Sequence, residues 1–135
     1  MRWISITAFA ALALAITAQA GTSSSVTIRH QMRGCHTWSV NGGAYKASQT
    51  MKVARGSSVT FTNNDVMPHM LSKTKGPAVT IRHANMRHMG ATAKVIFTHA
   101  GVYKFITKAG EDYPNMRGMK TIGEDNTLRL TVRVR

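Results

Sequence analysis

Cysteine, acidic residues and long apolar runs are all scarce in this chain of 135 residues. With one cysteine, Cys35, no intramolecular disulfide can form. Only five residues are Asp or Glu against 18 Lys and Arg, so the formal charge is +13. After residue 20 no apolar run is long enough to span a membrane, and we expect no stable membrane insertion. Glycine-rich phosphate loops and zinc-type CxxC motifs are also missing, which argues against nucleotide and structural zinc sites.

Residues 1–20 are typical of a secretory signal peptide. Arg2 supplies the positive charge, residues 4–17 are almost continuously apolar, and Ala18-Gln19-Ala20 has the small-x-small pattern of a cleavage site. We therefore expect cleavage after Ala20 and a periplasmic or secreted mature domain of residues 21–135. Loss of Arg2 lowers the formal charge from +13 to +12. This balance favours acidic partners, and nucleic acid fits an exported protein poorly.

Short β-branched and aromatic segments, separated by Gly, Asn, Asp and Pro, predict an all-β chain. The expected strands are 26–30, 38–40, 50–54, 58–62, 70–72, 77–81, 94–97, 102–107 and 127–134. The turn at 55–57 predicts a hairpin between its flanking strands, and residues 108–126 form a long loop. About eight or nine short strands at this spacing indicate a β-sandwich or barrel with Greek-key connections.

The nine residues from His30 to Trp38 hold the only cysteine and two of the six histidines. Thiolate and imidazole are transition-metal ligands, and an unpaired thiol in an oxidising compartment is a liability unless it is buried or coordinated. We interpret Cys35 as a metal ligand; the alternative is a buried, inert thiol. A Cys–His nucleophilic pair would need an orienting acid and an oxyanion site, and neither is evident in the sequence.

Three segments resemble the cupredoxins, the small blue copper proteins. The pattern Gly56-x-x-Val59-Thr60-Phe61-x-Asn63-Asn64-x-x-x-Pro68-His69 resembles the segment that carries their first histidine ligand. Ala100-Gly101-Val102-Tyr103-x-Phe105 resembles their penultimate strand, and Gly118-Met119 before residues 128–134 resembles their axial methionine and last strand. The resemblance implies a cupredoxin-like Greek-key β-sandwich with one mononuclear copper ion, bound by His69 and Met119.

The sequence departs from this family at the position of the cysteine ligand. Thr107 stands there, and residues 108–119 contain no histidine. In the family fold the loop between the first two strands lies at the same end as the metal loops, so the resemblance implies that residues 30–38 supply the missing ligands.

The predicted copper site is therefore a permuted type 1-like set of Cys35, His36, His69 and Met119. Two ligands keep alternatives. His30 can replace His36 as the second imidazole, although we favour His36, and Met116 can replace Met119 as the axial thioether.

A second group of imidazoles and thioethers suits copper, especially the reduced ion. It consists of His83, Met86, His88 and Met89. A solvated loop with methionines packed on the core is the alternative interpretation.

These observations predict a monomeric exported copper-binding protein, active in copper handling or tolerance or in one-electron transfer. Its expected partners are the copper ion and an acidic redox or copper-transfer protein. We expect no enzyme activity other than oxidation of cuprous ions. The alternative is a metal-free β-sandwich for docking or adhesion, with Cys35 as a buried structural residue.

Overall fold

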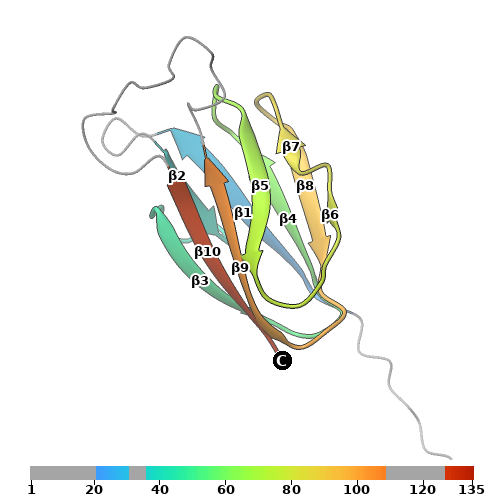
Figure 1. The fold of residues 1–135 in the computed structure, drawn as a ribbon. Coiled ribbons are helices and arrows are strands. Elements are labelled where there is room, and N and C mark those ends of the chain that lie inside the picture. The colour runs from blue at the N-terminus through green and yellow to red at the C-terminus, as the bar shows by residue number, and fades with distance from the viewer. Residues whose placement is uncertain (1–20, 31–35, 109–126) are drawn as a thin grey trace, which may run out of the picture.

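The computed structural model describes residues 21–30, 36–108 and 127–135, which form ten strands (Figure 1). The strands are β1 Ser23–His30, β2 His36–Val40, β3 Ser48–Val53, β4 Ser58–Asn63, β5 His69–Lys75, β6 Ile81–Arg82, β7 Asn85–Met86, β8 Thr92–Ile96, β9 Gly101–Lys108 and β10 Thr127–Val134. The predicted signal peptide lies outside these ranges. Among the residues described, no helix is long and apolar enough to cross a membrane.

Two five-stranded sheets pack face to face. The first sheet has the order β2-β1-β4-β8-β6, and the second has the order β3-β10-β9-β5-β7. In each sheet one pairing is parallel, β1 with β4 and β3 with β10, and the remaining pairings are antiparallel. The predicted all-β sandwich is confirmed by this two-sheet architecture.

The predicted hairpin at 55–57 is wrong, because β3 and β4 belong to different sheets. The turn between them forms hydrogen bonds with other parts of the chain: Arg55 N–H donates to Arg135 O at 2.8 Å, and Gly56 N–H donates to Phe97 O at 2.6 Å. These contacts direct the chain across the sandwich, so β3 pairs with β10 and β4 pairs with β1 and β8.

The predicted strand at 77–81 is also largely wrong, since regular pairing begins only at Ile81. Residues 76–80 carry the chain from the second sheet to the first. Pro77 has no N–H to donate to a neighbouring strand. The carbonyl oxygens of Gly76 and Pro77 accept hydrogen bonds from the Lys73 ammonium, at 2.9 and 2.5 Å, rather than from a paired strand. The short strand β7 was not predicted.

The core lies between the sheets and is rich in aromatic rings. Phe97 and Tyr103 meet edge to face with centroids 4.9 Å apart, and Phe61 and Phe105 lie 6.0 Å apart. Trp38 is also fully buried. Strand β10 adds aliphatic side chains to this core. Its Leu and Val side chains face the core while its Arg side chains face solvent, because side chains alternate along a strand.

Truncation of a core ring should cost far more stability than truncation of an exposed side chain. We expect Phe61→Ala to lower the free energy of unfolding by about 3–5 kcal/mol, because it leaves a cavity between the sheets. Ile96→Ala, at a side chain 39% exposed on β8, is the control and should change it by less than about 1 kcal/mol. Urea unfolding of both variants measures the difference, and equal losses would contradict the described core.

Candidate metal centre

The loop from β4 to β5 is shaped by Asn63, whose side chain is fully buried. Its Nδ2 donates to Met67 O at 2.8 Å and to Met86 O at 3.0 Å, while its Oδ1 accepts the Asp65 N–H at 2.9 Å. Asn at this position stabilises a turn by side chain to backbone hydrogen bonds. The turn places Asp65 inside the end of the sandwich rather than on its surface.

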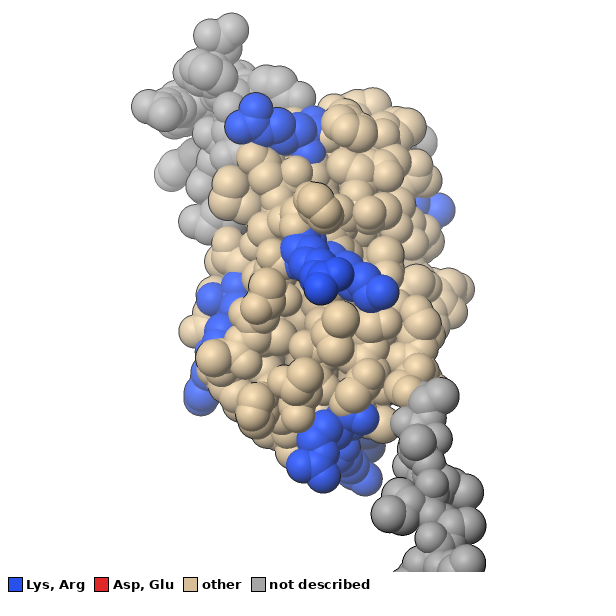
Figure 2. All heavy atoms as spheres, turned by 90° about the vertical axis from the view of Figure 1, so that its right-hand side faces the viewer, with Lys and Arg blue, Asp and Glu red and all other residues tan. Residues whose placement is uncertain are grey.

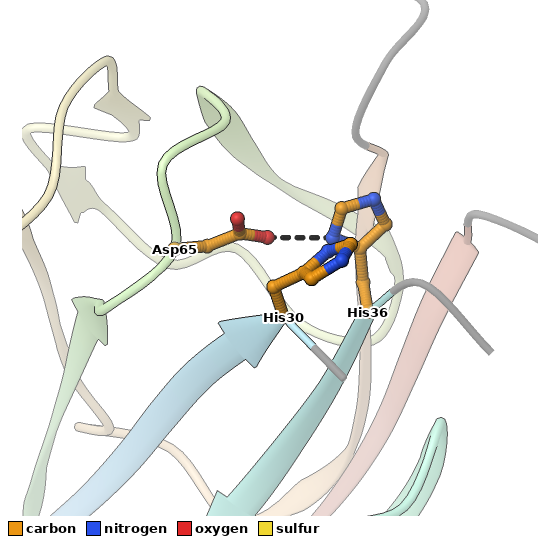
Figure 3. A group of neighbouring side chains, drawn as sticks. All are labelled: His30, His36 and Asp65. Carbon is orange, nitrogen blue, oxygen red and sulfur yellow. Dashed lines mark hydrogen bonds and ion pairs between the residues drawn. The ribbon is translucent and has the colours of Figure 1, made fainter. Parts of the chain in front are cut away.

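One oxygen of Asp65 joins two histidines from different parts of the chain. Asp65 Oδ2 lies 2.5 Å from His36 Nδ1, at the start of β2, and 3.0 Å from His69 Nε2, at the start of β5. Asp65 Oδ1 accepts the Met67 N–H at 3.2 Å. All three side chains are buried, with at most 2% of each exposed. Figure 3 shows the Asp65 carboxylate pointing at the His36 ring.

The carboxylate also sets the imidazole tautomers. An ionised carboxylate only accepts hydrogen bonds, so His36 Nδ1 and His69 Nε2 both carry protons. In neutral His69 the lone pair is then on Nδ1, which lies 3.2 Å from Thr107 Oγ1 on β9, and the Thr107 hydroxyl donates to it. In neutral His36 the lone pair is on Nε2, which points away from Asp65 in Figure 3.

Burial alone would raise the pKa of the Asp65 carboxyl. Hydrogen bonds from His69, the Met67 amide and His36, together with the charge of His36, outweigh that effect. The pKa of Asp65 consequently lies below its ordinary value of 3.8, and the group is ionised at neutral pH.

His30 lies at the exposed rim of this group. It pairs with His36 in the β1–β2 register, and their ring centroids are 5.6 Å apart. One ligand atom each from His30, His36 and Asp65 lies within 4.8 Å of the others. The His69 ring completes the cluster from the buried side, with its centroid 5.2 Å from that of His36.

The donors fit a transition-metal ion. Imidazole nitrogens bind such ions at about 2.0–2.1 Å, so two donors on one ion lie at most about 4 Å apart. The ligand atoms of His30, His36 and Asp65, which lie within 4.8 Å of one another, therefore have to approach by only about 1 Å to bind one ion. Imidazole with carboxylate suits copper and zinc, and because protons now occupy the His–Asp contacts, binding should release them.

The structure brings together the two predicted histidine ligands, His36 and His69, and places the alternative, His30, beside them. The other predicted ligands, Cys35, Met119 and the alternate Met116, lie outside the described residues. Thr107, which the resemblance puts at the family's cysteine position, does face His69.

The predicted secondary group is spread between the core and the surface. Met86 is fully buried and pairs with His69 in the β5–β7 register. His83, His88 and Met89 are exposed, and His88 Nδ1 lies 3.0 Å from Met89 O, so this ring nitrogen donates to the backbone. The Met86 thioether thus packs on the core, as in the alternative interpretation of this group.

Sequence reasoning missed Asp65 and the hydroxyl contact of Thr107. Three signals pointed to Asp65. It follows Asn63 by two residues, the spacing of an Asx turn, and it precedes His69 by four. It is also the only acid outside residues 109–126.

Thr107, His69 and Asp65 have the connectivity of a hydroxyl–imidazole–carboxylate catalytic relay. Each is at most 1% exposed, however, so a substrate cannot reach the Thr107 oxygen. In this geometry the relay fixes the His69 ring, as outer groups around metal-binding histidines do.

No protein-family model matches the sequence, and none of the curated proteins compared with it does. Similar solved structures include a purple cupredoxin from Nitrosopumilus maritimus, with 18% identity, TM-score 0.46 and coverage of 82% of this chain and 98% of that chain. A mutant of amicyanin with Cu(I) has 17% identity, TM-score 0.42 and coverage of 82% of both chains.

A cysteine protease inhibitor from Entamoeba histolytica has a similar TM-score of 0.45, with 8% identity and coverage of 84% of this chain and 97% of that chain. At these identities and TM-scores, the similar structures assign neither a family nor a ligand to this chain. The metal centre is therefore argued from its own donors.

Acid should remove the contribution of Asp65 to stability. Because folding lowers the Asp65 pKa, that contribution is complete above the ordinary value of 3.8 and is lost as the pH falls through the lower folded-state pKa. We expect Asp65→Asn to destabilise the metal-free protein by about 1.5–3 kcal/mol at pH 7. The gap between the two proteins should shrink below pH 3.8 in thermal unfolding at graded pH. A gap independent of pH would contradict an ionised Asp65 in the folded state.

Proposed function

We propose that this chain is an exported copper-binding protein, with the ion held between the start of β2 and the β4–β5 loop. The observation that carries the proposal is the shared Asp65 oxygen, which holds His36 and His69 within bonding distance of a single atom. Two buried imidazoles that converge on one carboxylate oxygen could bind a single ion that takes the place of the shared protons. His36 and His69 are the proposed first ligands.

Cys35 and Met119 complete the proposed donor set. Cys35 directly precedes His36 in the chain, so a ligand loop that carries both is short. Thiolate, two imidazoles and a thioether would make a type 1-like copper centre, and bound copper would supply one-electron chemistry. His30, exposed at the rim, is the proposed ligand for the entering ion rather than for the final site.

Thr107 supports the displaced position of the thiolate. Its hydroxyl donates to His69 from β9, where the family resemblance puts a cysteine. A threonine hydroxyl is not a soft ligand, so any thiolate must come from elsewhere in the chain, and Cys35 is the only cysteine.

We propose copper handling or tolerance as the role, in preference to one-electron transfer. The exposed imidazoles and thioether of His83, His88 and Met89 offer further soft and borderline donors on the same protein. A pure electron carrier has no evident use for them. The proposed location is the periplasm or the exterior, and the basic surface favours an acidic partner from which copper is received or to which it is passed.

A second function, a metal-free docking or adhesion module, is favoured by one observation. Asp65 already receives three hydrogen bonds, from His36, His69 and the Met67 amide, so its buried charge is compensated without an ion. The following experiment separates the two functions.

Copper titration of the metal-free protein should show one tight site. Isothermal titration calorimetry with Cu(II), repeated in two buffers of different ionisation enthalpy, should show binding of one equivalent of copper. The heats should also show release of protons, because the ion replaces the protons between the histidines and Asp65. Asp65→Asn should weaken binding by about 10–100-fold, and His36→Gln should weaken it more than His30→Gln.

His99→Gln is the matched control, because His99 is exposed and its Nδ1 contacts only the neighbouring Thr98 hydroxyl. Affinity that is equal in all these variants, or the absence of binding at one equivalent, would favour the metal-free module.

The thiolate is tested by colour. If Cys35 binds the ion, Cu(II) loading should produce an intense visible sulfur-to-copper absorption that Cys35→Ser abolishes. A weak absorption unchanged in Cys35→Ser would leave copper on imidazole and carboxylate ligands only, and would contradict the type 1-like part of the proposal.

A cysteine introduced at 107 should restore the usual position of the thiolate. In the Cys35→Ser background, Thr107→Cys places sulfur where Thr107 Oγ1 now lies 3.2 Å from His69 Nδ1. We expect this double variant to regain an intense visible absorption with Cu(II). Thr107→Ser in the same background is the control and should remain weakly coloured. A colourless Thr107→Cys variant would mean that the ion does not bind at His69 Nδ1, and would leave Nε2, the nitrogen that faces Asp65, as the ligand atom of His69.

A further inference from the structure

A groove of about 430 Å³ opens on the edge of the first sheet, formed by residues separate from the metal centre. It is lined by Ala78, Val79, Thr80, Arg82, Lys94, Ile96 and Thr98. Strand β6 pairs with β8 only at Ile81–Val95 and Arg82–Lys94. Residues 78–80, which precede Ile81, do not pair with β8. The groove lies between these residues and β8.

Two cations lie side by side in the lining of this groove. Arg82 and Lys94 are directly opposite in the antiparallel β6–β8 register, so their side chains lie on the same face of the sheet. Both are exposed, while the next pair along β8 includes the fully buried Val95, which confirms that the cations project outward. Like charges directly opposite on a sheet are destabilising unless an anion lies between them.

No acidic side chain of the described residues neutralises this pair. In the ranges 21–30, 36–108 and 127–135 the only acid is Asp65, and it is buried between His36 and His69. Figure 2 looks onto the side of the molecule that carries β6, β7 and β8, and shows Lys and Arg side chains with no Asp or Glu. Among the described residues, the exposed charges at this edge are therefore positive.

The remaining lining residues indicate what kind of anion fits. Thr80 and Thr98 offer hydroxyl donors beside the cations, and Ala78, Val79 and Ile96 give an apolar wall. Ile96 is 39% exposed, which is high for so large an apolar side chain. A small inorganic anion would use only the cations and hydroxyls, whereas a carboxylate on a polypeptide would also cover the apolar wall.

We propose that this groove binds an acidic polypeptide segment of a partner protein, with a Glu or Asp carboxylate between Arg82 and Lys94. The planar Arg82 guanidinium can bind a carboxylate in a bidentate manner, and Lys94 adds a second charge on the same side. Small apolar side chains next to the carboxylate pack on Ile96 and Val79. The groove uses no residue of the metal centre, so this proposal stands independently of copper binding.

The probe is a fluorescein-labelled octapeptide of alternating Glu and Ala, compared with a Gln–Ala peptide. Fluorescence anisotropy with the metal-free full chain at low salt should show binding of the Glu peptide only. Arg82→Gln with Lys94→Gln should weaken binding at least tenfold. Lys52→Gln with Lys104→Gln is the matched control, because it removes the same charge from exposed positions on the second sheet, and should weaken binding no more than about threefold.

The position of the bound peptide is checked by amide chemical shifts, which should change at Thr80, Lys94, Ile96 and Thr98. If the two double variants weaken peptide binding equally, binding depends on the net charge of the protein and not on this groove, and the proposal is overturned. Displacement of the peptide by an equal concentration of inorganic phosphate or of a heparin oligosaccharide would also overturn it, because the site would then select a small anion or a sulfated polymer.

Discussion

A single carboxylate oxygen, Asp65 Oδ2, links the strands at one end of this sandwich. It accepts hydrogen bonds from His36 on β2 and His69 on β5, and through His69 it is linked to Thr107 on β9. The two sheets are thereby joined at one end by polar contacts in addition to the apolar core. A buried carboxylate is unfavourable without partners, so the three strand ends are placed together by the requirement to compensate it.

The local structure was largely predictable, and the pairing of the strands was not. Alternation of apolar and polar residues located β1, β4, β9 and β10, because side chains of a strand alternate between core and solvent. The same pattern cannot tell which strands become neighbours. The turn at Gly56 looked like a hairpin turn, but its N–H donates to Phe97 on the far connection, and the strands separate into different sheets.

The metal centre shows the same division. His36 and His69 were predicted from residue type and from the cupredoxin resemblance, both of which can be read along the chain. Asp65 was not, because its role depends on an imidazole 29 residues away in sequence. The burial of Asp65 also separates the two signs of charge. In the part of the chain that the structure describes, the one acidic side chain is buried and the exposed charged side chains are positive. The two proposed functions, recognition of an acidic partner and binding of a metal cation, thus fall at different places on one small molecule.

The position of β10 has a consequence for the order in which the chain can fold. This strand, close to the C-terminus, lies between β3 and β9 in the interior of the second sheet, and its pairing with β3 is parallel. In the second sheet, β3 pairs only with β10, so β3 has no neighbour there until residues 127–134 are available. Contacts so distant in sequence delay folding because a long loop must close before they form. Pairing of β3 therefore depends on a strand that is far from it in sequence.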